Sequence, residues 1–350
     1  MMLGEAAREL GIDCQFLDPT AEPPAASIGD VIQAPYDDPA ALQALCSDAD
    51  VVTYEFENVP VDGLRTLPPE MPVYPPLNAL RKAQDRLLEK RLFERLDIPT
   101  SPFRNVESSD DATAAGEELG LPLVFKTRRF GYDGKGQAVV RSQTELETVF
   151  EELGQVPLIA EQLVNFDCEV SIFGARRPSG DVVHWPLSEN RHAGGILRVS
   201  RAPYDDPQLF ELATTYHRRM LDELDYVGVL TLEMFVVGDR LVANEFAPRV
   251  HNSGHWTIEG SETSQFANHI RAVLDQPLGV TDMRGAAAMV NLIGHIPEAV
   301  ATLKDPDICF HDYGKAPRAG RKLAHLTLVC DQKSSRDARL KALSETLSTD

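Results

Sequence analysis

The spacing of apolar residues changes repeatedly between the period of a helix and that of a strand. Near the start it predicts helices at 1–10 and 39–46 and strands at 12–17 and 50–54. Further along it predicts helices at 78–96, 111–119, 144–153, 207–224, 261–274 and 335–347, and strands at 121–126, 137–141, 158–161, 184–186 and 286–293. Helices that alternate with strands indicate an α/β fold, and the more strand-rich C-terminal part is predicted to be α+β.

The stretch 230–257 organises the rest of the chain. Two apolar strands flank a tight connection at 238–240, which predicts a hairpin that places Glu233 opposite Glu245. Side chains at such positions have Cβ atoms roughly 5 Å apart, where two carboxylates repel. A bound Mg²⁺ relieves this repulsion, and Asn244 adds a neutral oxygen ligand at the same place. The alternative is an exposed hairpin whose acids are solvated.

A polar loop follows the hairpin directly. Five hydrogen-bond donors lie close to Gly254 in the sequence, and so many donors in so short a stretch fit a small anion. The donors are Arg249, His251, Asn252, Ser253 and His255. A solvated polar loop remains the alternative.

A glycine-rich connection lies between the strands predicted at 121–126 and 137–141. Gly131, Gly134 and Gly136 surround Asp133 and Lys135 in the sequence KTRRFGYDGKGQ. Such a hairpin presents backbone N–H groups to phosphates, while Lys126 and Lys135 neutralise their charge. The spacing is not that of a P-loop, and the loop does not lead into a helix, so a Rossmann site is also excluded. A simple turn is the alternative.

Polar groups at other strand ends extend this candidate nucleotide site. In residues 161–164 an acidic side chain is followed by apolar ones, a combination that suits the ribose and adenine of a nucleotide. Glu169 and His192 follow in the sequence. Glu55 and Glu57 lie beyond the strand predicted at 50–54, where α/β sheets bind ligands. All of these side chains also fit solvated strand ends or loops.

Four cations lie close together near the C-terminus of a very acidic chain. Lys315, Arg318, Arg321 and Lys322 fall among glycines, which suggests a subsite for a phosphate monoester, the alternative being a solvated basic turn. The formal charge of −20 argues against general nucleic-acid binding. Five scattered cysteines argue against a disulfide framework and a structural zinc site. No apolar run approaches a membrane span and no leader is visible, so we expect a cytoplasmic protein with no membrane partner.

Taken together, these motifs resemble the ATP-grasp superfamily. Within it, the chain resembles the N5-carboxyaminoimidazole ribonucleotide synthetases through YEFEN, NALRKAQDRLLEK, KTRRFGYDGKGQ, HAGGILR, NEFAPRVHNSGHWT and GKAPRAGRKLAH. The resemblance implies an N-terminal Rossmann-like α/β domain at 1–98, a small lid at 99–165, the main ATP-grasp part at 166–285 and a C-terminal β-rich segment at 286–350. It also implies a homodimer.

The resemblance also implies roles for matching residues. Mg²⁺, with Mn²⁺ as a substitute, would be held by Glu233 and Glu245, and bicarbonate and its phosphorylated form by Arg249, His251, Asn252 and Ser253. ATP would be held by Arg81, Lys126, Gly131, Tyr132, Asp133, Gly134, Lys135, Gly136, Gln137, Glu161, Gln162, Leu163, Val164, Glu169, His192, Asn244 and Glu245. Aminoimidazole ribonucleotide would be held by Glu55, Tyr132, Asp133, Lys315, Arg321 and Lys322.

The implied activity is ATP- and bicarbonate-dependent carboxylation of this ribonucleotide in purine biosynthesis. Two alternatives stay open: another ATP-grasp ligase, such as one resembling the formate-dependent glycinamide ribonucleotide transformylase, or a nucleotide-binding protein with impaired catalysis. The second arises because the family opens with a strand and a Gly-rich loop, whereas the first predicted element here is a helix. We therefore expect in-frame codons upstream of Met1 to encode that strand and loop.

Overall fold

The N-terminal unit is a small α/β arrangement in a computed structural model that describes residues 1–131 and 135–347. Two parallel strands form its sheet, β1 (Gln15–Asp18) and β2 (Asp30–Gln33). Its helices are α1 (Met2–Glu9), α2 (Pro39–Cys46), α3 (Val61–Leu64) and α4 (Leu77–Ala83), and η1 (Pro24–Ser27) is a short 3-10 turn. The strand predicted at 50–54 is wrong, because Val52 forms only an isolated parallel bridge with Val73.

The helix predicted at 78–96 is two helices. Helix α4 ends at Ala83, and α5 (Arg86–Arg95) begins after Asp85, whose side chain accepts from the Leu87 N–H at 3.0 Å. The apolar spacing continues through the break, so it could not predict the interruption. An N-cap aspartate satisfies a free N–H group at a helix start and fixes where α5 begins.

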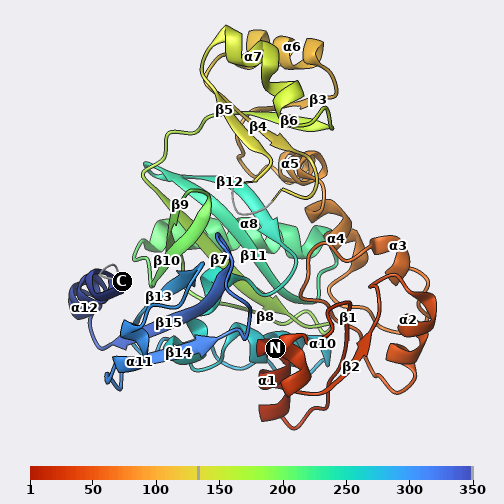
Figure 1. Cartoon of the computed structure of the whole chain (residues 1–350), viewed down its shortest axis with the longest axis vertical. Coiled ribbons are helices and arrows are strands. Elements are labelled where there is room, and N and C mark those ends of the chain that lie inside the picture. The colour runs from red at the N-terminus through yellow and green to blue at the C-terminus, as the bar shows by residue number, and fades with distance from the viewer. Residues whose placement is uncertain (132–134, 348–350) are drawn as a thin grey trace.

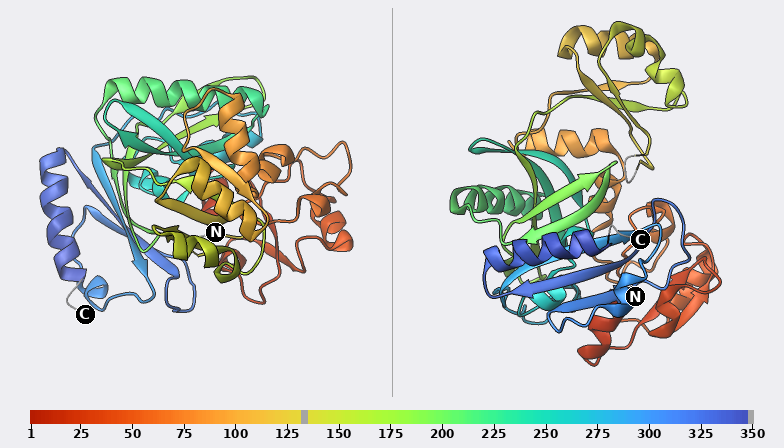
Figure 2. Two further views of the ribbon diagram at one scale, coloured as in Figure 1. Left: turned by 90° about the horizontal axis from the view of Figure 1, so that it is seen from above. Right: turned by 60° about the vertical axis from the view of Figure 1, so that its left-hand side comes forward.

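The lid is a separate four-stranded antiparallel sheet with two helices against it, and it stands off the main body (Figures 1 and 2). Its strands follow the order β3-β6-β4-β5. They are β3 (Phe103–Val106), β4 (Leu123–Thr127), β5 (Gln137–Val140) and β6 (Leu158–Gln162), with α6 (Ser109–Leu119) and α7 (Gln143–Glu152). Phe125, Leu146 and Leu158 lie in a hydrophobic core that belongs to the lid alone.

The main body is a nine-stranded sheet of order β12-β11-β7-β9-β10-β13-β15-β14, with β8 paired to β7. Along β11, Leu230 and Leu232 pack toward α8, whereas Val229 packs toward α1 and α10. The strands before the C-terminal segment are β7 (Cys168–Arg176), β8 (Val182–His184), β9 (Ser188–Ala193), β10 (Ile196–Ala202), β11 (Gly228–Val237) and β12 (Arg240–Ala247), with α8 (Pro207–Glu223).

Strand β12 lies at one edge of this sheet, and its outward backbone groups bond to neighbouring groups of α5 and the following segment. The Phe246 N–H donates to Glu89 Oε1 at 2.7 Å, and Lys90 Nζ donates to the Asn244 carbonyl at 2.9 Å. The Ala243 N–H donates to the carbonyl of Pro99 at 2.7 Å. The strand that carries Glu245 is thereby fixed to the helix that leads into the lid.

The C-terminal segment completes the same sheet, because β13 (Ala286–Ile293) pairs with β10. It also contains β14 (Ile308–Asp312), β15 (Lys322–Cys330), α11 (Ala299–Thr302) and α12 (Lys333–Leu347). The predicted boundary at 285 thus falls between strands of one sheet, and the basic residues lie in or next to the connection from β14 to β15.

The helix predicted at 261–274 starts later than expected. A 3-10 turn, η2 (Asn252–Gly254), precedes α9 (Thr257–Gly260), and α10 (Gln265–Val273) begins after Ser264, which caps it by accepting from Ala267 N–H. Among the described helices, none has the length and apolar character that crossing a membrane requires.

Candidate active site

The hairpin β11–β12 brings Glu233 and Glu245 into register as predicted. The turn is one residue shorter than predicted, because Arg240 pairs with Val237, and a bulge between Glu233 and Met234 restores the offset. The extra residue of the bulge is Asn244, since Met234 pairs with Ala243. A β-bulge redirects side chains next to it and is common beside active sites.

The carboxylates and Asn244 form a set of hard oxygen donors that fits Mg²⁺. The side-chain oxygen Oδ1 of Asn244 is buried and has no hydrogen-bond partner, which leaves one acceptor open beside the two acids. Within residues 1–131 and 135–347, no three acidic, histidine or cysteine side chains gather as a metal cage. Mg²⁺ suits this incomplete set of protein ligands, because it usually takes the rest of its coordination shell from water and phosphate oxygens.

Each carboxylate is paired with a cationic or ionisable partner. Glu245 Oε2 lies 2.9 Å from Arg86 Nη1, and Glu233 Oε1 lies 3.0 Å from His251 Nε2. Burial raises the pKa of Glu245, but the charge and hydrogen bond of Arg86 prevail and lower it to about 2. Burial likewise opposes ionisation of Glu233, yet His251 holds its pKa below the usual value. Both groups are therefore ionised at neutral pH.

Arg249 leaves β12 toward the N-terminal unit. Its Nε and Nη2 atoms donate to one oxygen of Glu57, at 3.1 and 2.7 Å, and Nη1 donates to the Val250 carbonyl at 3.0 Å. Glu57, one of the two acids predicted to lie beyond residue 54, thus contacts the loop that follows β12. The guanidinium is held in one orientation beside the polar loop.

His251 begins a chain of polar contacts that runs into the sheet. The Ser253 N–H donates to His251 Nδ1 at 3.3 Å, so Nδ1 is an acceptor and the ring proton lies on Nε2, facing Glu233. Ser253 Oγ lies 3.0 Å from Ser171 Oγ, which accepts from Asn190 Nδ2 at 2.5 Å. These buried contacts fix the orientation of His251.

Asn252 is fixed from the other side of the loop. It exchanges hydrogen bonds with Asn291 of β13, at 3.1 and 2.6 Å, and its Nδ2 lies 3.2 Å from His255 Nδ1. Of the four residues predicted to hold bicarbonate, His251 contacts Glu233 directly and Ser253 contacts His251, whereas Arg249 bonds to Glu57 and Asn252 to Asn291.

Lys126 enters the site from the lid strand β4. Its Nζ lies 3.1 Å from Glu161 Oε1, and Lys90 Nζ of α5 lies 3.2 Å from the other oxygen. Burial opposes ionisation of Glu161, but the two lysines lower its pKa to about 2. The Glu161 side chain is only 5% exposed, so it holds the two lysine ammonium groups from the protein interior.

The glycine-rich connection begins directly after β4. Gly136 has φ +69°, and a Cβ there would lie 2.6 Å from Thr127 Oγ1, so this position requires glycine. A Cβ at Gly131 would lie 3.2 Å from the Lys135 carbonyl, and Gln137 opens β5. The predicted ligands Tyr132, Asp133 and Gly134 lie outside the described residues.

Glu169 and His192 meet on neighbouring strands, where Glu169 Oε2 contacts His192 Nδ1. Burial disfavours the charged ring, but this contact and the charges of Glu233 and Glu245 raise the pKa of His192. Both residues line a hollow of about 780 Å³ that extends to α12. The effect of both charges on His192 places this ring within electrostatic range of the paired glutamates.

The remaining predicted nucleotide residues make contacts within α4 and the lid. Arg81 is exposed on α4 and donates to Asn78 Oδ1 at 3.3 Å. At the end of β6, Gln162 Nε2 donates to the Leu119 carbonyl at 3.2 Å, and the Leu163 N–H donates to the Pro122 carbonyl, also at 3.2 Å. Val164 follows in the segment that leads back to the main sheet.

The basic connection from β14 to β15 lies within electrostatic range of Glu55. Burial and the charge of Arg321 lower the pKa of Lys315, Glu55 opposes this shift, and Lys322 adds to it. Lys315 Nζ also lies 5.2 Å from the centre of the Tyr313 ring. Glu55, Arg321 and Lys322, which are predicted to hold the ribonucleotide, therefore lie within electrostatic range of Lys315.

Comparison with known proteins decides the family. Residues 1–84 match the ribonucleotide synthetase preATP-grasp domain, residues 91–266 the ATP-grasp domain, and residues 287–339 the phosphoribosylaminoimidazole carboxylase C-terminal domain. The N5-carboxyaminoimidazole ribonucleotide synthase of Pseudomonas aeruginosa is 47% identical over 97% of this chain and 94% of its own. This chain belongs to the N5-carboxyaminoimidazole ribonucleotide synthase family.

Solved structures agree with this assignment. The synthetase of Thermus thermophilus superposes with a TM-score of 0.94 at 47% identity, covering 100% of this chain and 96% of that one. The synthase of Aspergillus clavatus in complex with ADP and 5-aminoimidazole ribonucleotide gives a TM-score of 0.90 at 28% identity, covering 100% and 96%. The predicted fold class and membership of the ATP-dependent ligases are thereby confirmed.

Some residues that contact the candidate site were not predicted as ligands or partners. They are Gln84, Asp85, Arg86, Glu89, Lys90, Ser171 and Asn190. Of these, Asp85 carried a signal in the sequence, as an N-cap residue. The others act through partners distant in sequence, which residue spacing alone does not reveal.

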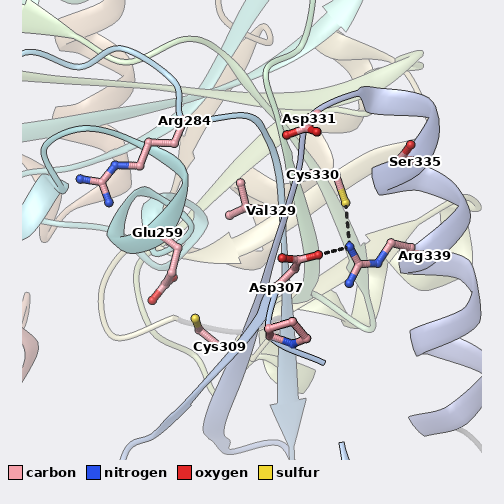
Figure 3. A pocket seen from close by; sticks show the side chains of 10 residues that line it. Glu259, Arg284, Asp307, Cys309, Val329, Cys330, Asp331, Ser335 and Arg339 are labelled. Atoms are coloured by element: carbon pink, nitrogen blue, oxygen red, sulfur yellow. Dashed lines mark hydrogen bonds and ion pairs between the residues drawn. The ribbon is translucent and has the colours of Figure 1, made fainter. Parts of the chain in front are cut away.

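A second hollow lies apart from the central site of this family member (Figure 3). It measures about 640 Å³ and lies among α9, the β14–β15 pair and α12. Arg339 closes one side by donating to Asp307 Oδ2 at 2.7 Å and to Cys330 Sγ at 3.6 Å. Its described lining includes no predicted site residue.

Proposed function

We propose that the site around Glu233 and Glu245 performs the reaction of the family. This reaction is the ATP- and bicarbonate-dependent carboxylation of the amine of 5-aminoimidazole ribonucleotide, in de novo purine biosynthesis. The observation that carries the proposal is the arrangement of the paired carboxylates. They lie between Lys126 of the lid and the loop of Arg249 and His251.

The residues suit a reaction that joins two anions. Bicarbonate is a poor electrophile, and its phosphorylation makes the carbon attackable but produces carboxyphosphate, which water destroys. Lys126 and the glycine-rich connection are placed to hold the phosphates of ATP, and Arg249, His251, Asn252 and Ser253 to orient bicarbonate and carboxyphosphate. Glu233, Glu245 and Asn244 would hold Mg²⁺, which supplies charge neutralisation at the transferring phosphoryl group.

Further roles follow from the contacts. Glu161 acts through Lys126 and Lys90, which it holds by ion pairs. Arg81, Gln162, Leu163, Val164, Glu169 and His192 surround the nucleotide, together with the glycine-rich connection. Mn²⁺ substitutes for Mg²⁺ at the oxygen donors, because both cations prefer such ligands.

The ribonucleotide is held from both ends of its site. Its phosphate is bound by Lys315, Arg321 and Lys322. The rest of the ribonucleotide is bound by Glu55 and by the loop residues Tyr132 and Asp133. Support comes from the convergence of Glu55 with the three cations in a chain of net charge −20. We also propose that the protein is a cytoplasmic homodimer. Light scattering of the purified chain tests whether it is a dimer.

The first test measures ATP consumption with bicarbonate, with the ribonucleotide, with both and with neither. We expect hydrolysis to rise when both are present, together with transfer of labelled carbon from bicarbonate to the ribonucleotide, measured at alkaline pH because a carbamate loses CO₂ in acid. ATP use that responds to formate and glycinamide ribonucleotide would identify a transformylase-like ligase. ATP binding with no turnover under any condition would contradict the proposal and indicate impaired catalysis.

Three substitutions separate the two anion sites. Lys315→Ala and Arg321→Ala should chiefly raise the KM for the ribonucleotide, because a phosphate far from the reacting nitrogen contributes equally to ground state and transition state. Arg249→Ala should instead lower kcat, because the group it meets gains charge during the reaction. Steady-state kinetics with each substrate varied in turn checks both expectations. An unchanged KM in Arg321→Ala would assign the basic connection to the solvated surface.

A further inference from the structure

The break between α4 and α5 touches three parts of the proposed active site through three consecutive residues. Gln84 contacts the loop that carries Glu57, Asp85 contacts the lid, and Arg86 contacts the metal-site acid Glu245. Figure 1 shows α4 and α5 in sequence between the N-terminal unit and the lid. The break is therefore a junction among substrate loop, lid and metal site.

The lid contact at this junction is specific. Arg128, directly after β4, donates through Nε and Nη2 to the two carboxylate oxygens of Asp85, at 3.0 and 2.6 Å. The Arg128 carbonyl in turn accepts from the Arg86 N–H at 3.0 Å. Such a paired contact fixes both distance and angle. The beginning of the glycine-rich connection thus keeps a defined position relative to residues 84–86.

Gln84 links this arrangement to Arg249. Its Nε2 donates to the carbonyls of Glu57 and Val59, at 2.9 and 2.8 Å, and its Oε1 accepts from Arg129 Nη2 at 3.2 Å. Glu57 is in turn the carboxylate to which both Nε and Nη2 of Arg249 donate. A continuous series of contacts therefore runs from the glycine-rich connection through Gln84 and Glu57 to Arg249.

We propose that Gln84 is a positioning residue that couples the lid to Arg249. It acts through the backbone of Glu57, so that Arg249 faces carboxyphosphate correctly only while the lid and the substrate loop are both in place. This inference rests on the proposed function. In the productive step the ribonucleotide nitrogen bonds to the carboxyl carbon, the carbon–oxygen bond to phosphate breaks, phosphate leaves with the electron pair, and the amine releases a proton. In the wasteful step water replaces the amine and regenerates bicarbonate.

Gln84→Met tests the coupling, because methionine is similar in volume and lacks both the donor and the acceptor. The ratio of amine consumed to phosphate released should fall by about three- to tenfold, less than the ~10²-fold cost of a fully misplaced catalytic group. Gln84→Glu keeps an acceptor for Arg129 but loses the donor to both carbonyls, and we expect the same fall. Glu57→Gln, which weakens the hold on Arg249, should lower the ratio as well.

The matched control is Gln208→Met, the same exchange at an exposed position on α8. It should keep the wild-type ratio and the wild-type Tm. An unchanged ratio in Gln84→Met would overturn the inference. A fall in the ratio that appears only together with a lowered Tm would also overturn it, because Gln84 would then have a structural role. A wild-type chain with no ribonucleotide-dependent carboxylation would instead overturn the proposed function itself.

Discussion

Glu233→Gln and Glu245→Gln should each lower turnover by at least ~10²-fold, the scale expected when one preorganised electrostatic group is removed. Glutamine keeps the size and hydrogen-bonding capacity of the side chain but removes the charge that holds Mg²⁺. Each substitution relieves a repulsion between facing carboxylates but also removes the charge that faces Arg86 or His251, so urea unfolding of both variants is measured beside turnover. Turnover at saturating ATP, bicarbonate and ribonucleotide is the measurement.

The control for this experiment lies on the same hairpin. Asp239→Asn removes an exposed carboxylate at the β11–β12 turn and should leave turnover unchanged. Direct titration with Mn²⁺ should show weakened binding in Glu233→Gln and Glu245→Gln but not in Asp239→Asn. Near-normal turnover in either glutamate variant would exclude this pair as the metal site.

Glu161→Gln should destabilise the chain by about 3–5 kcal/mol, the cost of breaking a buried ion pair from one side. The substitution leaves Lys90, whose side chain is 1% exposed, without its carboxylate partner. Lys126 loses the same partner but is more exposed. Urea unfolding followed by circular dichroism measures the change, and Glu147→Gln, at an exposed position on lid helix α7, is the control. A loss below about 1 kcal/mol, the scale of an exposed pair, would show that Lys90 finds solvent or another partner.

The same pair predicts a pH dependence with a definite sign. The pKa of Glu161 is lowered to about 2 from an ordinary value of 4.5, so the unfolded chain takes up its proton first as the pH falls. The stability from this group is complete above pH 4.5 and is lost as the pH falls toward 2. The difference in unfolding free energy between wild type and Glu161→Gln should therefore be constant above about pH 5 and shrink below it.

The hairpin shows both the reach and the limit of prediction from sequence. Facing Glu233 and Glu245 could be predicted, because alternation and a tight turn restrict strand register. The turn is nevertheless one residue shorter, and the bulge at Asn244 compensates for it. A bulge carries no reliable mark in a single sequence, since it depends on how the strand meets its neighbours.

The helix break shows a different limit. Apolar residues continue in register from α4 into α5, so periodicity predicted one helix, whereas tertiary contacts of Gln84, Asp85 and Arg86 favour two. The motifs that carry charge were easier to find, because Lys126, Arg249 and Lys315 lie among glycines and other polar groups. Their partners, Glu161, Glu57 and Glu55, are set by the fold, and only the structure shows which acid meets which cation.

The outward edge of β12 has a consequence for self-association. An exposed edge strand is a template on which another chain can add a strand, and aggregation often begins there. Here the Phe246 N–H, the Asn244 carbonyl and the Ala243 N–H are already taken by Glu89, Lys90 and Pro99. The strand that carries Glu245 is thereby covered by a helix and a short segment of its own chain, which prevents a strand of another molecule from pairing with it. A substitution that removes the Glu89 or Lys90 side chain should expose part of this strand edge and lower the solubility of the chain.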